Sequence, residues 1–95
     1  MTNDQIQALI NQRRRQVLIH SIIYYMLDDS IISDETWGRW AKELVELQNT
    51  YPEIAEQCVY ADDFRGFDNS TGFNLPLHDE WATRKAMQLL KWRKK

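Results

Sequence analysis

The chain has 95 residues, of which 43% are apolar and 12% aromatic, and its formal net charge is −2. A chain of this length builds one domain with one modest core, and its apolar content excludes a disordered protein. It holds one cysteine, Cys58, which excludes an intramolecular disulfide and suits a reducing cytoplasm. The longest apolar run, residues 17–27, is too short to cross a bilayer, and the polar N-terminus does not resemble a signal peptide.

The first predicted helix covers about residues 3–27. It opens with a capping box, in which the side chains of Thr2 and Gln5 bond to each other's backbone. The second half of this helix is apolar on all sides, so several other elements should wrap around it. The apolar residues at helical spacing are Ile6, Leu9, Ile10, Val17 and Tyr24.

A second helix is predicted from Asp34 to about Asn49, with Ser33 as its N-cap and two acids at its positive end. The short loop before it makes the two helices an antiparallel hairpin. The apolar positions of its inner face are Trp37, Trp40, Ala41, Leu44 and Leu47.

A short third helix is predicted up to about Cys58, with Thr50 and Glu53 as a second capping box and Pro52 in the first turn. Residues 59–78 are rich in turn formers and predict a long loop. Its apolar side chains should pack it against the core. They are Phe64, Phe67, Phe73 and Leu75.

A last helix is predicted at about residues 79–93, with Asp79 as its cap. Its inward-facing residues are Ala82, Ala86, Leu89 and Leu90. The chain is therefore predicted to be one all-α domain over residues 1–95. It would consist of an antiparallel helical hairpin at about 17–54, a short helix, a long packed loop at about 59–78 and the C-terminal helix.

Charge is distributed unevenly along the chain. Residues 28–68 hold eleven acids and three bases, whereas residues 84–95 hold six bases and no acid, so the two segments should attract each other. Bases interleaved with tryptophans also suit nucleic acid, although a solvated basic helix end has the same composition. The candidate nucleic-acid residues are Arg84, Lys85, Lys91, Trp92 and Arg93.

The connection of the hairpin concentrates aromatic and acidic side chains. We interpret Tyr24 and Tyr25 first as core aromatics with their hydroxyls at the rim, and alternatively as a stacking surface with Trp37. Neighbouring helix residues point about 100° apart, so the two tyrosines should not share one face, whereas Tyr24 and Asp28 should. We expect no metal here, because the spacing of the acids matches no known cation loop and capping explains two of them. These acids are Asp28, Asp29, Asp34 and Glu35.

Three further residues could carry chemistry but have ordinary structural interpretations. His20 lies in an apolar run and should be a hydrogen-bonded core residue. Cys58 should be a buried thiol, and His78 should be exposed.

The hairpin has a recognisable sequence pattern, "HSIIYYMLDDSIISDETWGRWAKELVELQNTYPEI", over about 35 of the 95 residues. It resembles the N-terminal helical domain of bacterial NAD-dependent DNA ligases. That family has a His, a Tyr-Tyr or Tyr-His pair, an Asp, a short loop, Asp-x-x-Tyr-Asp, Glu-Leu and a Tyr/His-Pro-Glu-Leu. The matching residues are His20, Tyr24, Tyr25, Asp28, Asp34, Glu43, Leu44, Leu47, Pro52 and Glu53.

The whole chain resembles small phage and prophage proteins called DNA ligase-related. The shared motifs are "RRRQVLIHSIIYY", "IISDETWGRWAKEL" and "DNSTGFNLPL". This resemblance implies a cytoplasmic location in a bacterial host, and it supplies a name rather than an activity.

In the ligases, this domain closes over the nicotinamide mononucleotide half of NAD, where aromatic rings stack on the nicotinamide and acids position it. The resemblance implies a nucleotide-binding site at Tyr24, Tyr25, Asp34 and Trp37, in which Trp37 replaces a tyrosine. Gly38 replaces a second aspartate of the family pattern. Because one carboxylate is lost, any binding of NAD or nicotinamide mononucleotide should be weak, near millimolar.

No catalytic residue is predicted. Ligase chemistry needs a nucleophilic lysine, and no lysine here is followed by x-Asp-Gly. The leading hypothesis is a non-enzymatic, phage-type protein-interaction module, a host-factor or defence modulator that binds an unidentified host or phage protein and no membrane. The alternatives are a degenerate nicotinamide-nucleotide-binding module and a nucleic-acid accessory protein that uses the basic C-terminal helix.

Overall fold

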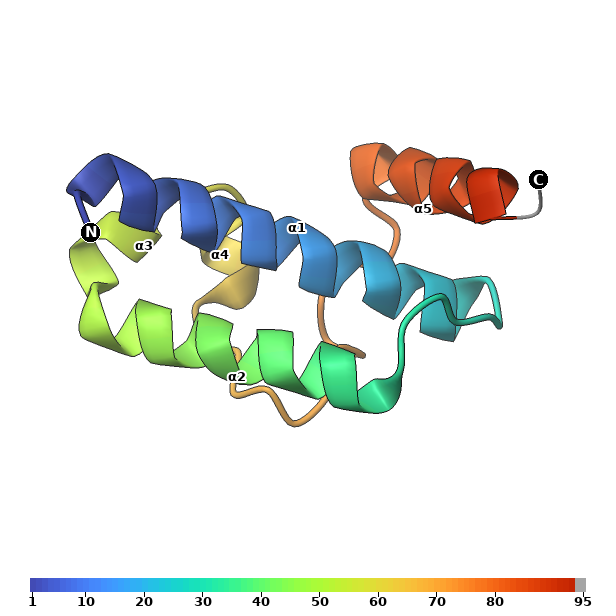
Figure 1. Ribbon diagram of the computed structural model, residues 1–95, viewed down its shortest axis with the longest axis horizontal. Coiled ribbons are helices and arrows are strands. Elements are labelled where there is room, and N and C mark those ends of the chain that lie inside the picture. The colour runs from blue at the N-terminus through green and yellow to red at the C-terminus, as the bar shows by residue number, and fades with distance from the viewer. Residues whose placement is uncertain (94–95) are drawn as a thin grey trace.

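A computed structural model describes residues 1–93 of the chain, and these residues form helices and loops without a strand, which confirms the all-α prediction (Figure 1). Lys94 and Lys95, part of the basic tail, lie outside the described residues. The central helix α1 has α2 antiparallel on one side and α5 along its C-terminal half on the other. The helices are α1 (Asn3–Met26), α2 (Asp34–Thr50), α3 (Pro52–Glu56), α4 (Ala61–Phe64) and α5 (Glu80–Arg93).

The two ends of α1 follow from local chemistry. The predicted capping box is present: the Thr2 hydroxyl accepts from the Gln5 N–H at 3.1 Å, and the Gln5 side chain accepts from the Thr2 N–H at 2.8 Å. The helix ends because Asp28 adopts a left-handed backbone with φ 50°, after which the Asp29 N–H donates to the carbonyl of Ile23 at 3.1 Å.

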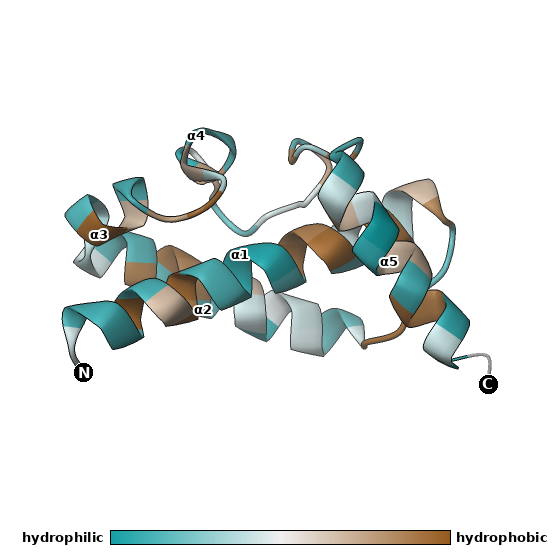
Figure 2. Cartoon of the chain, turned by 90° about the horizontal axis from the view of Figure 1, so that it is seen from above, coloured by the Kyte–Doolittle hydropathy of each residue, from teal (hydrophilic) through white to brown (hydrophobic). Residues whose placement is uncertain are grey.

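The second half of α1 is the core of the domain, as its all-round apolar pattern predicts (Figure 2). Different neighbours cover its different sides: α2 on one, α5 on another, and α3 near the first half. The buried apolar residues here are Val17, Leu18, Ile19, Ile22 and Ile23.

Helix α2 begins as predicted, because the Ser33 hydroxyl accepts the N–H of Thr36 at 3.1 Å. Ala41 and Leu44 are fully buried on its inner face. The flanking residues of the predicted stripe pack against the core while partly exposed; they are Trp37, Trp40 and Leu47. The hairpin and its register are confirmed.

The second predicted capping box is wrong. Helix α2 runs on to Thr50, so Tyr51 precedes α3, and no side chain caps that helix. Pro52 still occupies the first turn, where its missing N–H costs no hydrogen bond. The helix is shorter than predicted and ends at Glu56.

The long loop contains a short helix, α4, that the turn-rich composition did not predict. Phe64 and Leu75 are buried and Phe67 packs against the core, so the loop is held down as predicted. The prediction fails for Phe73, which is exposed. Its ring contacts Tyr25 edge-on at the surface, with ring centroids 5.6 Å apart, and does not reach the core.

Arg14 is a buried connection that the sequence pattern did not reveal, since it stands in a run of three arginines. It is 2% exposed. Its guanidinium donates to the Gln48 side chain at 2.9 Å and to the carbonyls of Ala55 and Val59 at 2.9 and 3.0 Å. These bonds tie α1 to α2, to α3 and to the start of the loop. Cys58 is buried nearby, and burial raises the pKa of its thiol.

Helix α5 is held at both ends. The Asp79 carboxylate accepts the N–H of Ala82 at 3.0 Å, which confirms the predicted cap, and also the Tyr60 hydroxyl at 2.8 Å. At the other end Arg93 pairs with Asp29 at 2.6 Å, so the acidic segment and the basic tail do meet at this pair. No helix within residues 1–93 has both the length and the apolar character needed to span a membrane.

Candidate functional site

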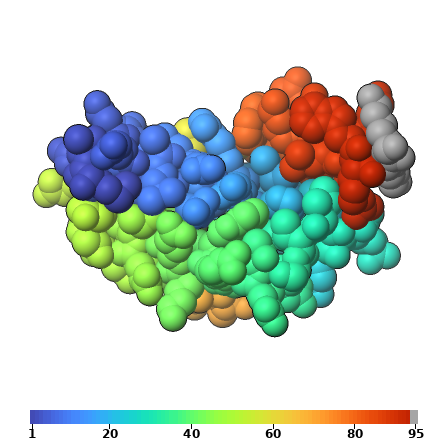
Figure 3. Space-filling model, viewed as in Figure 1, coloured from blue at the N-terminus to red at the C-terminus, as the bar shows by residue number. Residues whose placement is uncertain are grey.

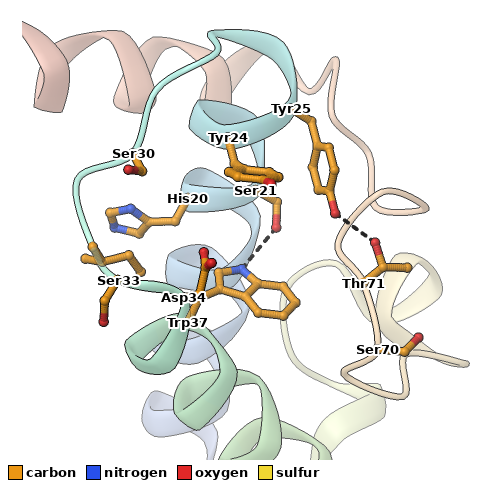
Figure 4. A pocket seen from close by; sticks show the side chains of 11 residues that line it. His20, Ser21, Tyr24, Tyr25, Ser30, Ser33, Asp34, Trp37, Ser70 and Thr71 are labelled. Atoms are coloured by element: carbon orange, nitrogen blue, oxygen red, sulfur yellow. Dashed lines mark hydrogen bonds between the residues drawn. The ribbon is translucent and has the colours of Figure 1, made fainter.

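A pocket of about 210 Å³ lies where the last turns of α1 face the N-terminus of α2 (Figure 4). Two residues of the long loop, Ser70 and Thr71, close a third side. The structure brings all four predicted nucleotide-site residues together around this pocket. The lining residues are His20, Ser21, Tyr24, Tyr25, Ser30, Ile32, Ser33, Asp34, Trp37, Ser70 and Thr71.

Trp37 is held in place by contacts with α1. Its indole N–H lies 3.2 Å from the Ser21 hydroxyl and 3.3 Å from the carbonyl of Val17, and it can donate to both. The Ser21 hydroxyl itself donates to the same carbonyl at 2.7 Å. The Trp37 ring is therefore pre-positioned at the pocket and would lose little freedom on binding a ligand.

The interpretation of the two tyrosines as core aromatics is wrong. Tyr24 is 55% exposed and Tyr25 is 38% exposed. The expectation that the two tyrosines should not share one face is also wrong, because both line the same pocket at the end of α1. Their rings meet edge to face, with centroids 4.9 Å apart. Asp28, expected beside Tyr24, lies beyond the end of the helix and outside the pocket lining.

The two tyrosines make different contacts: Tyr25 binds the long loop, and Tyr24 faces the pocket. The Tyr25 hydroxyl and the Thr71 hydroxyl are 2.9 Å apart and hydrogen-bonded, so Tyr25 attaches the long loop to α1. Tyr24 has no hydrogen bond to another side chain within residues 1–93, and its ring lies across the pocket from Trp37 (Figure 4). Tyr24 and Trp37 therefore offer their rings to a ligand, whereas Tyr25 is engaged with the long loop.

The electrostatics of the pocket are simple. Asp34 is its charged side chain, and no lysine or arginine is among the lining residues that the structure describes. His20 packs on Trp40 with ring centroids 5.7 Å apart, and burial lowers the pKa of its imidazole. The prediction of a hydrogen-bonded core histidine is wrong for Nδ1, which is buried without a partner within residues 1–93. The pocket thus combines aromatic faces with one carboxylate.

Nothing in the described chain forms a metal site: within residues 1–93 no three histidine, cysteine, aspartate or glutamate side chains gather as ligation would require. Asp29 is engaged by Arg93, and Ser33 rather than an acid caps α2.

Gly72 brings the long loop against the pocket. A Cβ at this position would collide with the Ser21 hydroxyl and would lie 2.9 Å from the Ser21 Cβ and 3.2 Å from the Trp37 ring. The loop approaches this closely only because the residue has no side chain. A larger residue at position 72 would displace the side chain of Ser21, which orients Trp37.

We therefore expect Gly72→Ala to reduce stability by about 1–3 kcal/mol through overpacking. The change should also alter the environment of Trp37. Urea unfolding followed by tryptophan fluorescence measures both effects. Gly66→Ala is the matched control, because a Cβ there has nothing within 4 Å and should be neutral or slightly stabilising. Equal unfolding midpoints for the two variants would contradict the close approach.

The predicted nucleic-acid residues lie apart from the pocket, on α5. Four of them share its outer face: Arg84, Lys85, Lys91 and Trp92 line one surface groove. Arg93 does not belong to this group, because its guanidinium binds the Asp29 carboxylate and the carbonyl of Ser30.

Comparison with known proteins supports the resemblance seen in the hairpin. A family model described as "DNA ligase-like, N-terminal NAD+-binding domain" matches residues 3–57. The chain belongs to this family. The matched residues form α1, α2 and α3, and therefore most of the pocket, whereas Ser70, Thr71 and α5 lie beyond them.

Among curated proteins, the chain is similar to bacterial DNA ligases. It is 41% identical to the DNA ligase of Pseudothermotoga lettingae over 75 residues, which are 70% of this chain and 11% of that ligase. It is 37% identical to the Desulforudis audaxviator ligase and 33% to that of Fervidobacterium nodosum, each over 57% of this chain and 8% of the ligase. The chain thus spans about a tenth of these relatives. No solved structure gives a significant match.

These matches favour the nicotinamide-nucleotide module over the interaction module that was the leading hypothesis. A phage origin and a host or phage protein partner stay predictions.

Proposed function

We propose that the chain is a nicotinamide-nucleotide-binding module whose pocket takes the nicotinamide ring and its ribose. The observation that carries this proposal is the convergence of Tyr24, Tyr25, Asp34 and Trp37 on one pocket. They come from two helices, Tyr24 and Tyr25 from α1 and Asp34 and Trp37 from α2, and they are the four that the ligase resemblance singled out. On this proposal the chain binds and does not itself join DNA.

The chemistry of the pocket fits the ligand. A nicotinamide ring attached to ribose is a pyridinium, a flat cation. Aromatic faces attract such a cation, and Tyr24 and Trp37 offer two of them across the pocket. The carboxylate of Asp34 adds a favourable charge, and the hydroxyl of Ser30, which also lines the pocket, can bond a ribose oxygen.

The lining also limits what the pocket can hold. With no lysine or arginine among the described lining residues, a phosphate group would find no cationic partner there. The riboside should therefore bind as well as the mononucleotide. The volume of about 210 Å³ is below the roughly 300–1,000 Å³ of sites that enclose whole drug-sized ligands, so binding near millimolar strength is expected.

Titration calorimetry with nicotinamide riboside tests this function. Asp34→Asn keeps the side-chain shape and removes the charge, so binding should weaken about 10- to 150-fold, the equivalent of one charge-assisted contact. Glu35→Gln is the matched control, since it removes a neighbouring carboxylate from the same helical turn but does not line the pocket. Equal weakening in both variants, or unchanged binding in Asp34→Asn, would contradict the proposed site.

A further inference from the structure

The outer face of α5 is a second surface that the nicotinamide pocket does not explain. The helix buries Ala82 and Ala86 against α1, and its opposite side faces solvent. In Figure 3, α5 and α2 lie on opposite sides of the C-terminal half of α1, so α5 forms an outer ridge. A surface groove of about 600 Å³ runs along it. Its lining includes Trp81, Arg84, Lys85, Met87, Lys91 and Trp92.

The charged residues that line this groove are all positive, and Glu80, the exposed first residue of α5, lies one turn before Arg84 and outside the lining. The sequence has no acid between residues 81 and 93, and Arg84, Lys85 and Lys91 are exposed. Arg15 of α1 adds a fourth cation at the edge of the groove. Its guanidinium lies 5.6 Å from the centre of the Trp81 ring, and the Lys85 ammonium lies 5.8 Å from the same centre. Trp81 therefore holds two cations in place, so the groove is complementary to a polyanion.

The groove also presents an open aromatic ring. Trp92 is 58% exposed, and Met87 is exposed beside it in the same groove. Arg93, the next residue, points away to the Asp29 carboxylate and so anchors the end of α5 under this ring. A large apolar ring held out to solvent among cations is a stacking platform for a flat anionic ligand.

We propose that this face binds single-stranded nucleic acid, with phosphates against Arg15, Arg84, Lys85 and Lys91 and a base stacked on Trp92. Single strands fit better than duplexes, because the bases of a duplex stack on each other and leave no face free for Trp92. Apart from Arg15, the surface lies outside residues 3–57, the part matched by the ligase family, and it does not depend on the pocket.

An anionic membrane surface is the competing partner, and the burial pattern speaks against it. A helix that lies on a membrane inserts a continuous apolar face and turns its charges outward. The small apolar residues of α5, Ala82 and Ala86, are already buried against α1. On the face that remains, Arg84, Lys85 and Lys91 stand between the two tryptophans along the helix, so no continuous apolar stripe is left.

The test is fluorescence anisotropy with a labelled oligothymidylate of about 15 nucleotides, a length that covers one typical site. Binding should weaken as salt rises, with the logarithm of the affinity falling by about 0.7 per phosphate contact against the logarithm of the salt concentration. The double change Lys85→Gln with Lys91→Gln should reduce this slope by about 1.4. Trp92→Ala should weaken binding roughly five- to 150-fold by removing the stacked base.

The matched control is Arg39→Gln with Lys42→Gln, which removes the same charge from exposed positions of α2. It should leave the affinity nearly unchanged, and circular dichroism should show that all variants stay helical. The proposal is overturned by an absence of binding at low salt, by equal losses in the groove and control variants, or by tighter binding of duplex. Tighter binding to vesicles of anionic lipid than to the oligonucleotide would assign the face to membranes instead.

Discussion

Replacing Arg14 by alanine should destabilise the domain by about 3–5 kcal/mol, because it removes a donor from several acceptors and truncates a large buried side chain. The guanidinium is 2% exposed and serves the carbonyls of Ala55 and Val59 and the side chain of Gln48. Without it, the buried carbonyl of Ala55 and two partly buried acceptors lose their donor, and a cavity opens beside the Phe64 ring, which lies 5.6 Å from the guanidinium carbon. Such a loss is a large share of the roughly 5–15 kcal/mol that holds a domain folded.

Urea unfolding monitored by circular dichroism measures this effect, and the neighbouring arginine provides the control. Arg13 pairs with Glu43 at 3.2 Å nearer the surface, so Arg13→Ala should cost no more than about 1 kcal/mol. Arg14→Lys keeps the charge but loses the fork geometry, so its stability should fall between the two. If Arg13→Ala and Arg14→Ala unfold at the same urea concentration, the buried network does not hold the helices together.

Leu44→Ala should cost about 2–5 kcal/mol, because Leu44 is completely buried between α2 and α1 and its truncation leaves a cavity. Leu47→Ala is the control one turn further along α2, where the side chain is only partly buried and the expected loss is smaller. Denaturant midpoints compare the two variants. A larger loss at Leu47 than at Leu44 would mean that α2 is rotated relative to the described packing.

The helices could be predicted where a local interaction decides their ends. The Thr2 and Gln5 box, the Ser33 cap and the Asp79 cap are contacts within three residues, and the structure contains all of them. The prediction of a capping box at Thr50 was wrong because the same residues are compatible with a second local structure. In that structure α2 continues to Thr50 and α3 has no side-chain cap. The sequence pattern of a few neighbouring residues does not decide between these two local structures.

The site could be predicted only in part. Tyr24 continues the helical apolar spacing of α1, so the pattern favoured the core, yet α1 ends two residues later and the Tyr24 side chain stays 55% exposed. Thr71 and Gly72 belong to the long loop that packs against this site. Thr71 contacts Tyr25, from which it is 46 residues away in the chain. Arg14 likewise finds its carbonyl partners 41 and 45 residues away. Such long-range contacts leave no periodic signal in the sequence.

The most direct test of the nicotinamide pocket is a nuclear magnetic resonance titration of isotope-labelled protein with nicotinamide riboside. The indole N–H of Trp37 and the backbone amides of Tyr24 and Asp34 should shift together and saturate near millimolar ligand. The indole of Trp92, on the far face of α5, is an internal control and should not move. Saturating shifts confined to the pocket are the predicted result. Unchanged Trp37 and Asp34 signals at several millimolar ligand, or shifts at Trp92 alone, would contradict it.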